Sequence, residues 1–114
     1  MTGRTVVFVQ SAAPGALRAA GACALAAVAM DQRVDVFLTG PAVAAVVAAH
    51  DGEADEPAGL LQQARREGAR LVACSASVVE QKVALGEAEA ALDAVVGWPT
   101  ILEWSRGVVD RFSF

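Results

Sequence analysis

Short apolar runs alternate along the chain with longer segments in which apolar residues recur at helical spacing. The runs predict buried strands at residues 6–9, 34–38, 70–74 and 108–114. The first three are continuous rather than alternating, which is typical of parallel strands covered on both faces. The last carries the charged pair Asp110-Arg111, which favours a place at the edge of the sheet.

The segments between the strands carry helix signals. Ser77 and Glu80 have the S-x-x-E spacing of a capping box, which predicts that a helix begins at Ser77. Pro99 and Gly107 bracket the last helical segment, as proline does at the start of a helix and glycine beyond its end. Helices are expected over residues 16–30, 41–50, 60–68, 77–86, 87–96 and 99–107.

This alternation predicts an α/β fold, a three-layer α/β/α sandwich around a mainly parallel sheet of four or five strands. The runs at 6–9, 34–38 and 71–74 are expected to be neighbouring central strands, joined by right-handed crossovers. A length of 114 residues fits a single domain spanning residues 1–114.

Charge and hydropathy narrow the range of partners. The net charge of −4 argues against nucleic acid and against anionic membrane surfaces, because both need clustered Lys and Arg. Although 55% of residues are hydrophobic, the charge-free run 19–30 is shorter than the roughly 20 residues of a membrane span. The first residues resemble a strand rather than a signal peptide. We therefore expect a cytoplasmic protein with free thiols.

Cys74 is the main candidate for chemistry. It ends a predicted strand just before a predicted helix, and ligands of open α/β sheets bind beyond the carboxyl ends of the strands. The positive end of a helix dipole favours a thiolate, which is the reactive form of cysteine. The residues leave a second interpretation open, in which Cys74 is a small buried hydrophobic residue that completes the strand.

The other candidates carry weaker signals. Cys23 lies within an Ala-rich helix, opposite the face that should meet the sheet, so this helix is expected to be covered again by a subunit or a neighbouring helix. His50 is the only histidine, and with two distant cysteines it gives no metal-site spacing. The acidic stretch 51–57 reads as a solvated loop. Trp104 lies off the helix face of Trp98, Ile101 and Leu102, which indicates an interface anchor or partial burial.

The turn after the first strand lacks both glycine-rich phosphate motifs, so no nucleotide site is indicated. Gln10 and Ser11 in this turn are still expected at the rim of the crevice, as are Ser75 and Ser77 beside Cys74. We predict these four residues as substrate-binding positions around the cysteine.

The layout of the whole chain resembles the DsrE/DsrF-like sulfur-relay family. The resemblance rests on the Ala-rich first helix and on five segments. These are T-V-V-F-V (5–9), R-V-D-V-F-L-T-G (33–40), R-L-V-A-C (70–74), G-W-P-T-I-L-E-W-S (97–105) and V-V-D-R-F-S-F (108–114). The resemblance implies that Cys74 accepts persulfide sulfur from a protein donor and passes it to a protein acceptor, as in tRNA thiolation or sulfur oxidation. It also implies a homotrimer or homohexamer and a transfer that needs no metal or cofactor. The C-S-A-S context without a nearby histidine and the acidic loop depart from the family pattern.

A second function remains open, an oligomeric module that uses the same crevice to bind a protein or a small ligand without a reactive thiol. Under the relay hypothesis Cys74, and not Cys23, is the reactive thiol.

Overall fold

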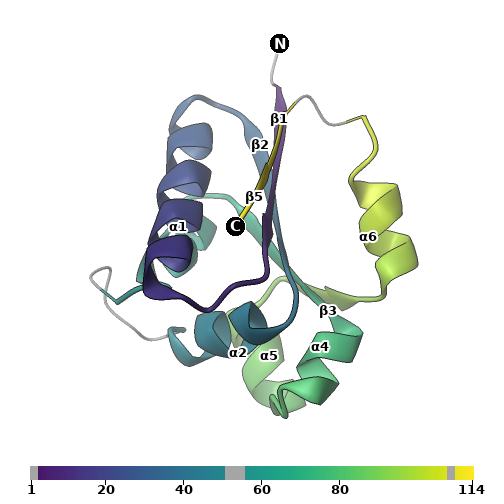
Figure 1. Ribbon diagram of the computed structural model, residues 1–114. Helices are drawn as coiled ribbons and strands as arrows, with labels where there is room; N and C mark the ends of the chain where they lie inside the picture. Colours follow the sequence, from purple (N-terminus) through teal and green to yellow (C-terminus); the bar gives the residue numbers. More distant parts are fainter. Residues whose placement is uncertain (1–2, 51–55, 108–109) are drawn as a thin grey trace.

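The computed structural model describes residues 3–50, 56–107 and 110–114 (Figure 1). Residues 51–55, which hold most of the predicted acidic loop, lie outside the described part. In chain order the elements are β1 (Arg4–Val9), α1 (Pro14–Ala29), β2 (Arg33–Leu38), α2 (Pro41–Ala48), α3 (Gly59–Arg66), β3 (Arg70–Cys74), α4 (Ser75–Glu80), α5 (Leu85–Ala91), β4 (Ala94–Val96), α6 (Trp98–Trp104) and β5 (Asp110–Ser113).

The strands form one sheet in the order β4-β3-β2-β1-β5, and every neighbouring pair is parallel. The predicted central strands are therefore neighbours, as expected, and β5 lies at an edge with all four residues exposed. This arrangement is the predicted α/β/α fold.

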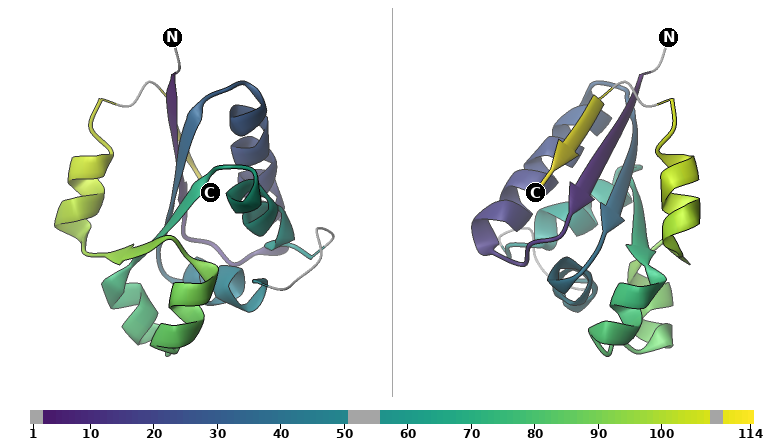
Figure 2. Two further views of the ribbon diagram at one scale, coloured as in Figure 1. Left: turned by 180° about the vertical axis from the view of Figure 1, so that it is seen from behind. Right: turned by 45° about the vertical axis from the view of Figure 1, so that its right-hand side comes forward.

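The strand order explains how the helices are distributed. From β1 to β4 the chain always moves to the next strand in one direction, and it then returns past β1 to place β5. Right-handed crossovers put the connections of the first three steps on one face and the returning connection, α6, on the other. Figures 1 and 2 show α6 alone on one side of the sheet, with α1 on the opposite side.

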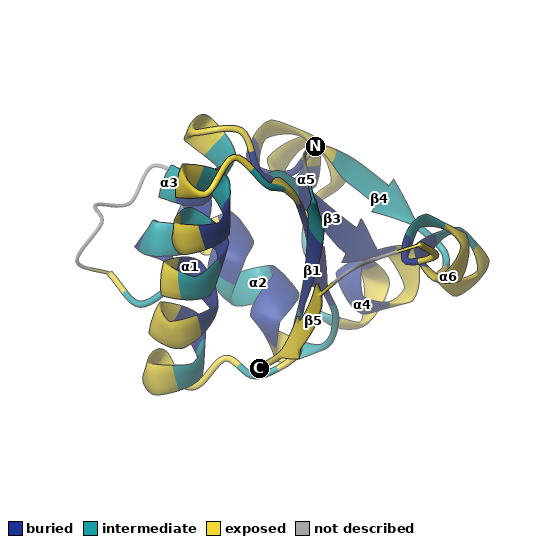
Figure 3. Cartoon of the chain, turned by 90° about the horizontal axis from the view of Figure 1, so that it is seen from above, coloured by how far each residue is buried: buried dark blue, intermediate teal, exposed yellow. Residues whose placement is uncertain are grey.

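The two faces of the sheet have cores of unequal size. The larger core takes alternate strand residues together with α1, α2, α3, α4 and α5. The smaller core contains the buried residues Val6, Phe37, Val72, Cys74 and Ile101, and α6 is the one helix that contributes to it among the described residues. The view along the sheet in Figure 3 shows the thicker helical layer on the α1 side.

Three predicted helix limits are wrong. The helix predicted to end near Gly86 ends at Glu80, and Gly86 belongs to the next helix, α5. The helix predicted from Ser77 begins at Ser75, and the hydroxyl of Ser77 does not cap it but accepts a hydrogen bond from the Gly40 amide at 2.8 Å. The segment 87–96 is not one helix: α5 ends at Ala91, and the chain then pairs with β3 as the short strand β4. Pairing with the edge of the sheet satisfies the backbone hydrogen bonds of β4, and the spacing of apolar residues does not indicate this pairing.

The predicted inward face of the last helix is also wrong. Ile101 is buried as expected, but Trp98 and Leu102 are 47% and 60% exposed, and Trp104 is the half-buried one. The helix is only seven residues long, so its spacing alone does not define which side meets the sheet.

No helix in the described ranges is long and apolar enough to cross a membrane.

Candidate functional site

Cys74 lies at the carboxyl end of β3 and is at the same time the N-cap residue of α4. The helix therefore starts directly after the cysteine, two residues earlier than predicted. The amide N–H groups of the first turn of a helix have no partner within the helix. Cys74 is thus closer to such groups than the sequence indicated.

The side chain of Cys74 belongs to the smaller core. Cys74 is 2% exposed and shares its cluster with Val72 of the same strand and with Ile101 of α6. In sheet register it pairs with Val96, the last residue of β4. The thiol is therefore covered on the α6 side in a single chain, and a reagent reaches it only if this side opens.

The two serines predicted beside Cys74 lie in different environments. Ser75 is the first residue of α4 and is exposed, so its hydroxyl is available to a ligand. Ser77 is buried, and its oxygen is engaged by the amide of Gly40, which joins α4 to the turn after β2. The hydroxyl of Ser77 therefore makes a structural contact within the fold.

Gln10 and Ser11 follow β1 at the same edge of the sheet. The carbonyl of Phe114 accepts both of their amide N–H groups, at 3.0 and 3.5 Å, and the hydroxyl of Ser11 accepts from the amide of Ala13 at 3.0 Å. These bonds fix the turn that leads into α1. The side chain of Gln10 is exposed, whereas its backbone is fully used by the fold.

The turn after β2 connects these positions across the carboxyl edge. The amide of Ala42 donates to the carbonyl of Gln10, and the amide of Gly40 donates to Ser77. Gly40 has φ of +55°, a conformation that side chains disfavour. Gln10 and Ser77 thus bind the same turn, while β1 and β3 themselves are two strand spacings apart, about 10 Å.

The strand order reverses between β1 and β5, and not at β3. The expected crevice of a doubly wound sheet therefore lies near Gln10 and Ser11, where the Phe114 carbonyl occupies the turn. Cys74 is at the carboxyl edge, as predicted, but away from the reversal. The structure thus separates Cys74 from Gln10 and Ser11, which were predicted to belong to one site.

Cys23 is half-buried on α1, beside a hollow of about 250 Å³ that is also lined by Met30 and by Phe112 of β5. Burial raises the pKa of the Cys23 thiol above its ordinary value, so the thiol stays protonated near neutral pH. A protonated thiol is a poor nucleophile. The side of α1 opposite Cys23 was expected to meet the sheet, but at Gly21 it packs against α3.

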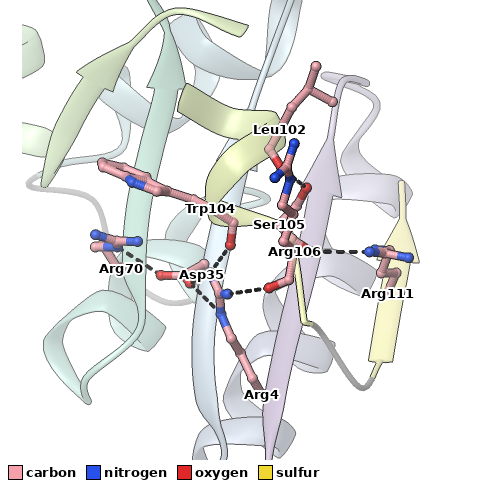
Figure 4. A network of polar contacts seen from close by, with 8 residues as sticks. All are labelled: Arg4, Asp35, Arg70, Leu102, Trp104, Ser105, Arg106 and Arg111. Carbon is pink, nitrogen blue, oxygen red and sulfur yellow. Dashed lines mark hydrogen bonds and ion pairs between the residues drawn. The ribbon is translucent and has the colours of Figure 1, made fainter. Parts of the chain in front are cut away.

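A polar network lies on the α6 face at the amino end of the sheet, at residues that the sequence pattern did not single out (Figure 4). Asp35 of β2 is 1% exposed and forms ion pairs with Arg4 at 2.7 Å and with Arg70 at 2.8 Å. An acidic residue inside a buried strand was the available signal, because a buried charge needs a partner.

The same network binds the end of α6. Arg4 donates to the backbone carbonyls of Trp104 and Arg106, and the guanidinium of Arg70 lies over the Trp104 ring at 4.2 Å. A cation above an indole face is an attractive arrangement. Trp104 is therefore held within the chain, which is the partial burial that the sequence left open.

Metal-ligating residues do not gather anywhere in the part of the chain that the structure describes: no group of three His, Cys, Asp or Glu side chains could hold an ion.

Comparisons with known proteins are consistent with this architecture. The YchN protein from E. coli superimposes with a TM-score of 0.77 over 100% of both chains at 14% identity. A protein of unknown function from Methanobacterium thermoautotrophicum, MTH1491, gives 0.72 over 96% of this chain and 98% of its own at 18% identity. These likenesses concern the fold. A comparison with curated protein sequences found no significant match. The profile of the DsrE/DsrF-like family matches residues 4–106, and the chain belongs to this family.

Proposed function

We propose that the protein is a sulfur carrier that accepts persulfide sulfur at Cys74 from a donor protein and passes it to an acceptor protein. The observation that carries the proposal is the position of Cys74, which ends a central strand and caps α4 in a chain of the DsrE/DsrF-like family. Cys23, by comparison, lies in the interior of α1, where the amide groups of the helix are already used within it.

The transfer is a thiol–disulfide type of exchange. Once the α6 side has opened, Cys74 loses its proton to solvent, and the thiolate attacks the outer sulfur of the donor persulfide. A new S–S bond forms at Cys74 while the S–S bond of the donor breaks, and the donor cysteine leaves as a thiolate. Attack by an acceptor thiolate on the outer sulfur of Cys74 reverses these roles. The exchange itself consumes no oxidant or reductant and calls for no metal or cofactor.

Hydrogen-bond donors that can stabilise a negatively charged sulfur follow Cys74 directly. The first-turn amides of α4 follow the cysteine directly, and the exposed hydroxyl of Ser75 is a further donor. Ser77 supports the geometry through Gly40, and Gln10 supports the same turn from β1. We place the relay in the cytoplasm, where thiols stay reduced between transfers.

Cys74→Ser is expected to abolish persulfide loading, because the serine hydroxyl is not a sulfur nucleophile at neutral pH. The measurement is mass spectrometry of the intact protein after incubation with a persulfide donor, in which the unaltered chain gains one sulfur atom. Cys23→Ser is the matched control and should load like the unaltered chain. Loading that persists in Cys74→Ser contradicts the proposal and favours the alternative, a module that binds a partner without a reactive thiol.

We also propose that the carrier works as a homotrimer or homohexamer. Its surface exposes large apolar side chains on several elements away from α6, among them Met30, Val79 and Leu85. Monomers rarely leave wide apolar surface open to water. Sedimentation at micromolar concentration is expected to give a multiple of the chain mass, and a single species near 11.7 kDa is the contrary result.

A further inference from the structure

We propose that α6 is a movable cover over Cys74, and that the Arg4–Asp35–Arg70 network holds the C-terminal end of this cover closed. The inference rests on the proposed function in one respect, since a sulfur carrier must expose its thiol to its partners. The cover itself is argued from the packing of α6 and from the contacts at its two ends.

The position of α6 places it between the thiol and the network. The helix follows β4, whose last residue Val96 pairs with Cys74 at the carboxyl edge. It must return to the amino edge, because β4 and β5 both run parallel to the central strands. Its seven residues span about 10 Å, and the four steps from Cys74 back to Arg70 span about 13 Å. Figure 1 shows α6 alone on this side of the sheet.

The middle of α6 is weakly packed. Ile101 is its single buried residue and enters the cluster that contains Cys74. Trp98 and Leu102 point to solvent, as their exposures of 47% and 60% require. By contrast, α1 buries five residues. A helix held by so little apolar burial opens locally at a lower free energy than the rest of a fold.

The C-terminal end of α6 is held by contacts from β1, β3 and β5. Arg4 of β1 donates to the carbonyls of Trp104 and Arg106, and Arg70 of β3 lies over the Trp104 ring. Asp35 of β2, buried between the two arginines, fixes both of them. Figure 4 shows these side chains converging under the helix end. In addition, Arg111 of β5 donates to the carbonyl of Ser105 at 3.1 Å.

These contacts make the network a positioning device for Cys74. Carbonyl groups at the end of α6 accept bonds from a charged guanidinium, and such bonds are stronger than neutral ones. Weakening them should raise the fraction of molecules in which α6 is displaced. Because Ile101 packs in the cluster of Cys74, displacement of α6 uncovers the thiol and leaves the sheet intact.

The test measures how fast Cys74 reacts with N-ethylmaleimide in a Cys23→Ser background, so that one thiol is present. Arg4→Gln removes the charged donor from the helix end and is expected to raise the labelling rate about tenfold, the effect of one lost charge-assisted hydrogen bond. Arg65→Gln is the matched control. Arg65 likewise pairs with an aspartate, Asp93 at 3.2 Å, and donates to a carbonyl, that of Ala90, but it contacts no part of α6. Its labelling rate should stay within about twofold.

A second measurement needs no altered network and remains informative if Arg4→Gln fails to fold. Native-state hydrogen exchange of the unaltered chain should show the α6 amides exchanging faster than those of β1, β2 and β3. Equal labelling rates in the two arginine variants, or α6 amides that exchange only with global unfolding, overturn the inference. Labelling reports access and not sulfur transfer. A chain that labels as expected but takes up no persulfide therefore refutes the relay and leaves the cover intact.

Discussion

Phe37→Ala is expected to lower the free energy of unfolding by about 3–5 kcal/mol, the range measured when a buried phenylalanine is truncated. Phe37 is fully buried near the carboxyl end of β2, which lies between β1 and β3. Its ring lies 5.4 Å from that of Phe8 in the smaller core. This core is covered by one short helix, and a rigid sheet lies beneath it, so the cavity left by the ring has few side chains available to fill it.

The measurement is urea unfolding followed by circular dichroism, at one protein concentration for all variants. Phe112→Ala is the control, because Phe112 is 43% exposed on the edge strand and its loss should cost less than about 1 kcal/mol. A loss of similar size in both variants would show that the α6 face is not a packed core, and it would remove the basis for a covered Cys74.

The sheet could be predicted from the sequence because its strands are buried on both faces. In such strands nearly every residue is apolar, so the run itself is visible without its neighbours. β1, β2 and β3 were found for this reason. β4 was missed because it is three half-buried residues whose strand character comes only from pairing with β3.

The last helix shows what periodicity does not define. Both tryptophans of α6 are large and apolar, and spacing placed Trp98 inside and Trp104 outside. The structure reverses them, because the Trp104 ring finds the guanidinium of Arg70 while Trp98 lies beyond the edge of the core. The arginine that decides this is 34 residues away in the sequence, so no local pattern contains it.

The candidate site divides in the same way. That Cys74 ends a strand and precedes a helix is local information, and the sequence predicted it. That its side chain is buried under α6 follows from strand order, because only the returning crossover after β4 places a helix on that face. The same order puts the reversal of the sheet between β1 and β5, which separates Gln10 and Ser11 from the cysteine. The sequence therefore predicted where Cys74 lies in the sheet, but it did not predict whether the side chain is accessible to solvent.

Gly21→Val is expected to lower the free energy of unfolding by about 3 kcal/mol, at the upper end of what overpacking costs. In the structure Gly21 lies against α3. A Cβ atom at Gly21 would lie 2.4 Å from the Cβ of Leu60 and 3.1 Å from backbone atoms of Leu60 and Leu61. Because backbone atoms are among the contacts, α3 itself must move to admit the new side chain.

Gly15→Val, in the same helix, provides the control for this substitution. A Cβ atom at Gly15 meets nothing within 4 Å, so this change should alter stability by no more than about 0.5 kcal/mol. Both variants exchange glycine for the same β-branched residue in α1, and both reduce the conformational entropy of the unfolded chain equally. The difference between their urea midpoints therefore isolates the approach of α1 to α3. Equal midpoints would mean that the two helices can separate at no cost. The larger core would then owe its stability to contacts with the sheet alone.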